Sequence, residues 1–386
     1  MKRFVVKIIN FLKGLSIILF TFLILPFSRL FLGHKKIWLV SENELEGRDN
    51  GYVFFKYIRE NHTTINCYYP INFKSKDYTK IAKLGNVIKF GSLKHYIYFC
   101  AAKYNISSKS EGFFPSYYLQ LLKRKIGLFG TYIFLQHGII KDDLMHFYKK
   151  KAKFDLFICG AKPEYIDIQK KYGYHDNEVV YTGLARFDTY HSLETKNQIL
   201  IMPTWRRGIN EANILESDYF QTWNRVINSQ HINELLKKHS IYAYFYVHPQ
   251  FQKYSEYFKT DCSNIVVASF NNYDVQILIR ESKMLVTDFS SVFFDFGYMK
   301  RPVIYYQYDE DAFFGTHYIK GYFDYRKDGF GPVCNTFDDF VKKMQLYLEN
   351  GCKMDGNGLK NHKVFFPLFD NKNCERIFQS ITKIGG

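Results

Sequence analysis

The sequence predicts an α/β protein with two domains of similar construction. Three observations lead to this prediction. Short apolar runs alternate with stretches of helical periodicity, which is the pattern of a parallel sheet covered by helices. The alternation breaks in a polar stretch at residues 183–198 and then starts again. The length of 386 residues is enough for two or three domains of ordinary size.

The first series of strands begins after residue 35. An apolar run at residues 37–40 precedes a predicted helix at 51–60, for which Asp49 and Asn50 are the expected caps. Short apolar runs bounded by polar residues are typical of buried strands. Further runs of this kind lie at residues 66–69, 87–88, 104–107, 132–135, 156–158 and 179–181. We therefore expect residues 34–188 to form the first domain.

The second series repeats the alternation. Its apolar runs lie at residues 199–202, 242–247, 265–267, 284–287 and 303–306. The closing segment 370–384 has a helical pattern, and we expect it to pack back across the first half. Residues 189–386 are thus predicted to be the second domain, with a closing helix.

The N-terminus places basic residues before an apolar run at residues 15–25. A bilayer span needs about 20 apolar residues, and this run is shorter. We expect residues 1–33 to associate with the cytoplasmic face of the cell membrane, either in its plane or as a single anchor. A buried core helix is the third alternative. A removed signal peptide is disfavoured because no small-residue cleavage site follows.

Composition narrows the class of partner. Apolar residues make up 47% of the chain, which excludes a disordered or fibrous protein. The net charge of +16 suits anionic partners such as nucleic acid, phospholipid headgroups or phosphate-rich substrates. The seven cysteines are scattered without a CxxC pair, which disfavours a disulfide scaffold or a zinc site and favours a reducing compartment.

Polar clusters follow several predicted strands, where open α/β sheets bind their ligands. In the first domain, His137 and Gly138 follow a strand, with Lys141 just beyond. An imidazole can take a proton near neutral pH, and glycine lets the backbone approach a ligand closely. In the second domain, Arg206 offers a donor fork suited to phosphate, and His248 ends another strand. The alternatives are a loop histidine, a solvated basic loop and a strand-end turn.

The most informative cluster lies at residues 285–295. A strand ends at Thr287, and Ser290 and Ser291 are predicted to open a helix whose N-terminus attracts phosphate. Asp295 lies four residues after Ser291 in an otherwise apolar helix, where a lone carboxylate needs a partner. The alternative is a serine that only caps the helix and an aspartate bonded to structure.

Other motifs are missing from the sequence: there is no GxGxxG after the first strand, and no GxxxxGK[ST], HExxH or GxSxG. We expect no metal site and no nucleic-acid partner, although a loosely bound Mg²⁺ stays open. The basic run at residues 149–153 is interpreted as a solvated or membrane-facing patch, with RNA binding as a minor option.

Together the clusters resemble the CDP-glycerol glycerophosphotransferase family, whose members include the primases and polymerases of teichoic acid and related capsule polymers. The family pattern contains an HG…K loop, a GLPRxD segment, a PTWR segment, an HP pair, and a TDYSS…FD segment followed by a P-x-x-x-Y strand. The similar segments here are residues 137–141, 183–188, 203–206, 248–249, 287–295 and 302–306.

The resemblance implies a GT-B-like fold, in which two Rossmann-like domains face each other across a cleft and the second holds most of the donor. It also implies transfer of glycerol phosphate from CDP-glycerol, or of ribitol phosphate from CDP-ribitol. The acceptor would be a hydroxyl of a lipid-linked or polymeric molecule, and CMP would leave. An anionic membrane surface is the expected further partner.

The same resemblance gives the predicted residues their roles. His137 is the expected catalytic base, and His248 is its rival and a catalytic candidate that also contacts the donor. Asp295 is expected to bind alditol hydroxyls. The predicted donor-binding residues are Gly138, Lys141, Arg206, Ser290, Ser291 and Asp295.

Two alternatives stay open. One is a GT-B glycosyltransferase that uses a nucleotide sugar for surface polysaccharide synthesis. The other is a non-catalytic, membrane-bound protein that binds polyanions.

Overall fold

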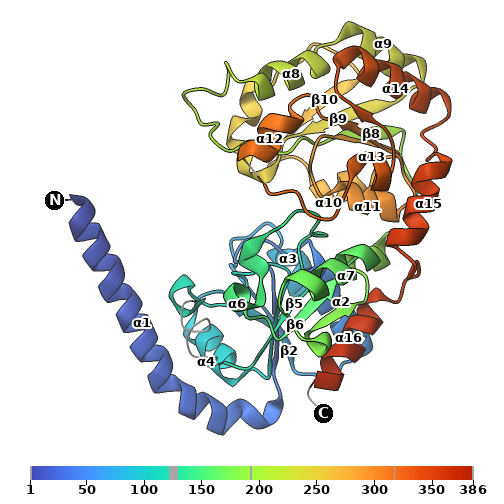
Figure 1. Ribbon diagram of the computed structural model, residues 1–386. Helices are drawn as coiled ribbons and strands as arrows, with labels where there is room; N and C mark the ends of the chain where they lie inside the picture. The colour runs from blue at the N-terminus through green and yellow to red at the C-terminus, as the bar shows by residue number, and fades with distance from the viewer. Residues whose placement is uncertain (1, 121–128, 192–193, 317, 385–386) are drawn as a thin grey trace.

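The computed structural model describes residues 2–120, 129–191, 194–316 and 318–384. Its two parallel sheets form two bodies, one above the other in Figure 1. The strand orders are β3-β2-β1-β4-β5-β6-β7 and β10-β9-β8-β11-β12-β13. Both orders run outward from a central first strand, as in the Rossmann fold, with one further edge strand in the first sheet. The predicted α/β class with two Rossmann-like halves is confirmed.

The first sheet is buried on both faces, which is why its strands are short continuous apolar runs. Its strands are β1 (Trp38–Ser41), β2 (Cys67–Ile71), β3 (Val87–Lys89), β4 (Tyr104–Ser107), β5 (Thr131–Phe134), β6 (Leu156–Cys159) and β7 (Val179–Tyr181). The α-helices that follow these strands are α2 (Asn50–Asn61), α3 (Tyr78–Ala82), α4 (Leu93–Ala101), α6 (Lys149–Ala152) and α7 (Lys162–Lys171). All seven predicted strands are confirmed to within two residues at each end.

The second sheet contains one strand that the sequence did not predict. Its strands are β8 (Gln198–Ile201), β9 (Tyr242–Tyr246), β10 (Ile265–Ala268), β11 (Leu285–Thr287), β12 (Val303–Tyr306) and β13 (Val333–Cys334). Its helices are α8 (Asp218–Ile227), α9 (Gln230–Lys238), α10 (Val275–Glu281), α11 (Phe293–Tyr298), α12 (Glu310–Thr316), α13 (Tyr325–Asp328), α14 (Phe337–Glu349) and α15 (Gly356–Phe365). The unpredicted β13 has two residues, too few to show a pattern.

The last helix returns to the first sheet. After α15, the chain runs down one side of the molecule into α16 (Asn373–Ile384), which lies beside α2 (Figure 1). Ile377 and Ile381 are buried in the same apolar cluster as Trp38 and Phe54. The Phe378 ring also stacks on Trp38, with 5.6 Å between ring centroids. The expected packing of the closing segment on the first half is confirmed, while the domain bounds 34–188 and 189–386 stay a prediction.

The N-terminal segment forms one helix, α1 (Lys2–Leu32), which passes alongside α4 (Figure 1). A narrow stripe of α1 is buried and includes Gly14, Thr21, Leu25 and Ser28. A side chain at position 14 would collide with the Tyr118 ring, since a Cβ there would lie 2.6 Å from it. Most of the other side chains of α1 between residues 8 and 31 are apolar and exposed. Residues 8–35 are long and apolar enough to cross a membrane by length and composition, with a mean hydropathy of 2.3.

Candidate active site

Loops that follow strands of both sheets meet between the two bodies. If Gly138 carried a Cβ, it would lie 3.2 Å from the Ser291 Oγ, so the two predicted loops are in direct contact. A Cβ on Gly321 would lie 2.1 Å from the carbonyl oxygen of Lys141, and glycine is required at this backbone crossing. The predicted residues His137, Gly138 and Ser291 are therefore brought to one place.

His137 is exposed at the end of a rigid loop. Gln136 before it has a φ of +62°, its carbonyl accepts a hydrogen bond from Asn50 Nδ2 at 2.7 Å, and its Nε2 donates to the Ile158 carbonyl at 2.5 Å. The imidazole of His137 is 66% exposed. Its Nδ1 lies 2.5 Å from the Oδ2 of Asp49, so one ring nitrogen is turned inward and tied to a carboxylate.

The loop that carries Asp49 is organised by a buried glutamate. Glu42 follows β1 and accepts hydrogen bonds from the backbone N–H groups of Arg48, Asp49 and Tyr52, at 2.8–2.9 Å. Burial, with the nearby charge of Asp49, raises the pKa of Glu42 to about 7. Asp49 is the N-cap residue of α2, as predicted, but its carboxylate makes no capping hydrogen bond. The carboxylate of Glu42 accepts the hydrogen bond of the Tyr52 N–H instead, so the Asp49 carboxylate is available to bind His137.

Arg186 joins this group to the second domain. Its Nη1 donates to Asp49 Oδ1 at 2.9 Å and to the carbonyl of His137 at 2.6 Å. Its Nε and Nη2 donate to the two oxygens of Asp295, at 2.7 and 2.9 Å. Tyr190 also donates to Asp295, at 2.6 Å. Both oxygens of Asp295 are thus engaged by protein groups, which favours a structural tie for this carboxylate; its predicted contact with alditol hydroxyls stays a prediction.

Lys141 is buried and paired. Its ammonium contacts the carboxylate of Asp142 and lies over the Tyr325 ring, 5.3 Å from the centroid. Its loop is held by the buried Glu164, which accepts from the Ile140 N–H at 2.6 Å. Burial raises the pKa of Glu164 to about 7. Lys141 therefore lies at the domain contact with its charge balanced.

Arg206 lies within a second charge cluster. Its Nη2 donates to Asp288 at 2.8 Å, and its Nε and Nη2 donate to Asp309 at 2.8 and 2.9 Å. The guanidinium is buried over the Phe313 ring, 4.9 Å from its centroid. Two carboxylates already occupy these donors, so the geometry favours a role in ordering the loop. Direct contact of Arg206 with the donor stays a prediction.

His248 lies beside the same loop. Its ring is 6.5 Å from the Trp205 ring between centroids, and its Nδ1 accepts from the Gln250 N–H at 3.3 Å. The residue is half-buried. His248 and Arg206 are therefore neighbours through Trp205, on loops of the second sheet.

The predicted helix start at the two serines is wrong by two residues. The helix α11 begins at Phe293, and Ser290 and Ser291 form the turn before it. Their carbonyls accept from the Phe293 and Phe294 N–H groups at 3.3 and 3.1 Å. Both serines are half-buried. The apolar helix that follows is buried along its whole length, which fixes the turn from behind.

Several residues of this site were not assigned to it from sequence. Asp49 was predicted only as a helix cap, and Arg186 only as part of a domain-junction motif. Glu42, Glu164 and Tyr190 were not singled out. A usable signal existed for Glu42, because an acidic residue directly after a buried strand lies at the ligand-binding edge of a sheet.

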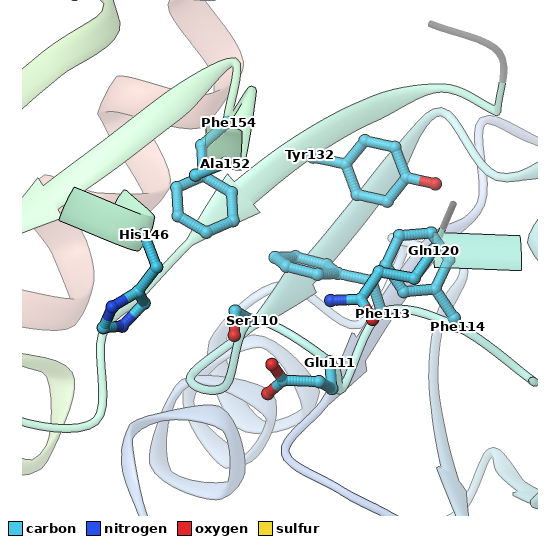
Figure 2. A pocket seen from close by; sticks show the side chains of 9 residues that line it. All are labelled: Ser110, Glu111, Phe113, Phe114, Gln120, Tyr132, His146, Ala152 and Phe154. Carbon is cyan, nitrogen blue, oxygen red and sulfur yellow. The ribbon is translucent and has the colours of Figure 1, made fainter. Parts of the chain in front are cut away.

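Within the described residues, no group of three or more histidine, cysteine or acidic side chains is arranged to hold a metal ion. The seven cysteines are buried and free. A cavity of about 230 Å³ opens in the first domain, and none of its lining residues belongs to the site around His137 (Figure 2). It is lined by Ser110, Glu111, Phe113, Phe114, Gln120, Tyr132, His146, Ala152 and Phe154.

Comparison with solved structures supports the fold. The wall teichoic acid polymerase TagF superposes with a TM-score of 0.65 at 18% identity, over 98% of each chain. A UDP-N-acetylglucosamine 2-epimerase from Listeria monocytogenes is more distant, with a TM-score of 0.55 at 11% identity, over 89% of this chain and 94% of that one. At these identities the likeness shows a shared GT-B-like architecture and no more.

Comparison of sequences is more specific. The chain is 33% identical over 366 residues to the minor teichoic acid biosynthesis protein GgaB of Bacillus subtilis, covering 91% of this chain and 40% of GgaB. It is 26% identical over 180 residues to the teichoic acid glycerol-phosphate primase of the same organism, covering 44% of each. The chain thus spans less than half the length of these relatives.

A family model extends the match over nearly the whole chain. The model for CDP-glycerol:poly(glycerophosphate) glycerophosphotransferases matches residues 22–383, which include every loop of the site described above. The resemblance inferred from the sequence clusters is confirmed: this chain belongs to the CDP-glycerol:poly(glycerophosphate) glycerophosphotransferase family.

Proposed function

We propose that this protein transfers glycerol phosphate from CDP-glycerol to a hydroxyl of a lipid-linked or polymeric acceptor and releases CMP, in the synthesis of teichoic acid or a related capsular polymer. Family membership supports the reaction class. The observation that carries the proposal is the exposed imidazole of His137, tied to a buried carboxylate and set beside the Ser291 turn of the second domain.

In the proposed reaction, the acceptor hydroxyl attacks the phosphorus that bears glycerol. Its proton passes to Nε2 of His137, a new P–O bond forms, and the bond to the CMP oxygen breaks with CMP as the leaving group. The histidine comes from the first domain and the Ser290–Ser291 turn from the second. This placement supports attack from the first-domain side, opposite the departing CMP.

The predicted donor-binding residues divide into two sets. Gly138, Ser290 and Ser291 lie at the meeting of the loops, and we propose that they contact the reacting phosphate. Lys141, Arg206 and Asp295 have charged partners in the protein. We propose that these three residues hold the loops in place and contribute to the electrostatic potential at the reacting phosphate. His248 is proposed to contact the donor from the second domain.

The alditol is proposed to be glycerol, with ribitol as the close alternative. TagF has been solved after a soak with CDPG. A poly(ribitol-phosphate) polymerase of Bacillus spizizenii is 25% identical to this chain over 204 residues, which keeps ribitol open.

The proposed location is the cytoplasmic face of the cell membrane. The α1 helix exposes large apolar side chains such as Leu19, Leu23 and Phe27 while a narrow stripe packs on the first domain. A helix that buries one stripe in protein and exposes apolar residues elsewhere suits the membrane interface. We propose that it holds the enzyme next to a lipid-linked acceptor.

One assay tests the reaction. Purified full-length protein is offered CDP-glycerol, CDP-ribitol or a UDP-sugar with a teichoic acid acceptor, and the release of CMP or UDP is followed. CMP release that depends on both CDP-glycerol and acceptor supports the proposal. Turnover of a UDP-sugar with none of a CDP-alditol would replace it with the nucleotide-sugar alternative. Polyanion binding without turnover of any donor would support the alternative of a non-catalytic protein that binds polyanions.

A further inference from the structure

Two charged residues behind His137 have no part in the proposed reaction. Asp49 and Arg186 are buried, with side chains 3% and 7% exposed, whereas the His137 imidazole is 66% exposed. Within the described residues, the hydrogen bond of the His137 ring is made through Nδ1, on its inner side. Nε2 is therefore the nitrogen on the side of the ring that an acceptor hydroxyl can reach.

The charge on Asp49 decides which ring nitrogen carries the proton. Burial alone would raise the pKa of Asp49, but the His137 ring and the Arg186 guanidinium outweigh burial and hold that pKa below its usual value. An ionised carboxylate accepts hydrogen bonds and cannot donate one. The 2.5 Å contact with Nδ1 therefore requires Nδ1–H, and in the neutral ring this leaves the lone pair on Nε2.

Arg186 fixes the two partners together. A single nitrogen, Nη1, donates to Asp49 Oδ1 and to the carbonyl of His137, so one group sets both the carboxylate and the backbone of the histidine. The rest of the guanidinium is held by Asp295 of α11. The distance between His137 and the second domain thus depends on the fork of Arg186.

We infer that Asp49 and Arg186 are positioning residues for His137: Asp49 holds the ring with Nδ1 protonated and Nε2 bare, and Arg186 fixes Asp49 and the His137 backbone relative to the second domain. This inference rests on the proposed function, because it takes His137 as the base. Neither side chain reaches substrate, since both are buried and their oxygens and nitrogens point to protein partners.

The first test removes the charge of Asp49 and keeps its volume. In Asp49→Asn, the side-chain amide can donate to Nδ1, which favours the opposite tautomer with Nε2 protonated. Because a base contributes about 10²–10⁴-fold to rate, kcat should fall by about that factor. KM for CDP-glycerol should stay within about threefold, since no ground-state contact with the donor is lost.

The second test reads the tautomer without turnover. The protein is labelled with ¹⁵N-histidine, and the signal of His137 among the 12 histidines is identified by its loss in His137→Gln. In its neutral ring, the wild type should show Nδ1 protonated and Nε2 bare. Asp49→Asn should show a large population with Nε2 protonated.

Asp77→Asn is the matched control. Asp77 is also a buried aspartate of the first domain, 7% exposed, and it accepts from Arg48 at 2.9 Å. Its replacement breaks a comparable aspartate–arginine pair in the same loop, because Arg48 precedes Asp49, but it removes no contact of the His137 ring. The control should lose folding stability, keep kcat within about fivefold of the wild type and keep the His137 tautomer.

The outcomes separate this inference from the proposed function. Wild-type protein that releases no CMP from CDP-glycerol would overturn the function, and the tautomer measurement would still test Asp49. An active wild type with unchanged kcat in Asp49→Asn would overturn the inference alone. A loss of kcat with an unchanged tautomer would also overturn it, because Asp49 would then act only through the stability of the loop.

Discussion

The charged residues of this site mostly face one another. Arg186 and Arg206 each bridge two carboxylates, and each is almost fully buried. A buried ion pair is costly to break from one side, because the partner is left uncompensated. Of the predicted residues, this leaves the imidazole of His137 as the side chain most clearly exposed toward a substrate.

Replacing the two histidines separates their roles. His137→Ala should lower kcat by about 10²–10⁴-fold with little change in CDP-glycerol affinity, because it removes a base and no donor contact. His248→Ala should weaken CDP-glycerol binding as well as turnover. Initial rates of CMP release and calorimetric affinities for both variants make the comparison. Near-normal turnover in His137→Ala would remove His137 from the mechanism.

A third histidine makes folding stability depend on pH. His95 in α4 is fully buried, and burial lowers its pKa from 6.5 to about 3. The unfolded chain takes up a proton below pH 6.5 and the folded chain does not, so stability is full above that pH and is lost as pH falls from 6.5 toward 3. The contribution is about 1.4 kcal/mol per pH unit within that window.

Urea unfolding at pH 7, 6 and 5 checks this prediction. In the wild type, the Gly91 N–H donates a hydrogen bond to His95 Nδ1 at 3.1 Å. His95→Asn keeps an acceptor for this N–H, but the asparagine side chain does not titrate. Its stability should fall less steeply with acid than that of the wild type. His231→Asn, at an exposed position, is the control and should keep the wild-type slope. Parallel slopes for His95→Asn and wild type would contradict the prediction.

At the scale of elements, the strands were predictable because both sheets are buried on two faces. Each strand from β1 to β12 is an apolar run between polar ends, and this pattern needs no knowledge of partners. The contacts of the loop side chains were harder to predict from the sequence. Asp49 is the N-cap residue of α2, but its carboxylate binds His137, and Glu42 accepts the hydrogen bond of the Tyr52 N–H instead. The tie between Arg186 and Asp295 joins residues 109 positions apart, and no local pattern predicts such a pair.

The α1 helix carries its own prediction. The triple variant Leu19→Gln, Leu23→Gln and Phe27→Gln changes three exposed side chains and leaves the buried stripe intact. Each apolar side chain that enters the membrane contributes about 1.5–3 kcal/mol of free energy, so its loss should weaken binding. For the three together, partition into anionic vesicles should weaken by at least about 100-fold. Flotation of full-length protein with vesicles measures this. Leu346→Gln on α14, also exposed, should leave flotation unchanged. Unchanged flotation of the triple variant would contradict membrane contact through α1.

At the scale of the molecule, Asp295 adds a buried ion pair between two domains that also share an apolar cluster, in which Ile139 of the first domain lies with Phe293 of the second. Asp295→Asn should lower the free energy of unfolding by about 3–5 kcal/mol, because Arg186 is left buried with one carboxylate fewer. Urea denaturation followed by tryptophan fluorescence measures the loss. Asp370→Asn breaks the partly exposed pair with Arg376, at 2.9 Å, and should cost less than about 1 kcal/mol. Equal losses of unfolding free energy in the two variants would show that the interdomain pair stabilises the protein no more than a partly exposed pair does.

The return of α16 to the first sheet has a mechanical consequence. The chain crosses between the sheets twice, and the two crossings are fastened together where Asp188 accepts from the N–H groups of Asn373 and Cys374, both at 2.8 Å. Two crossings that are fastened together limit the directions in which one domain can turn relative to the other. Any separation of the domains must also break the Arg186–Asp295 pair, so these ties favour one closed arrangement, with the His137–Gly138 loop against Ser291.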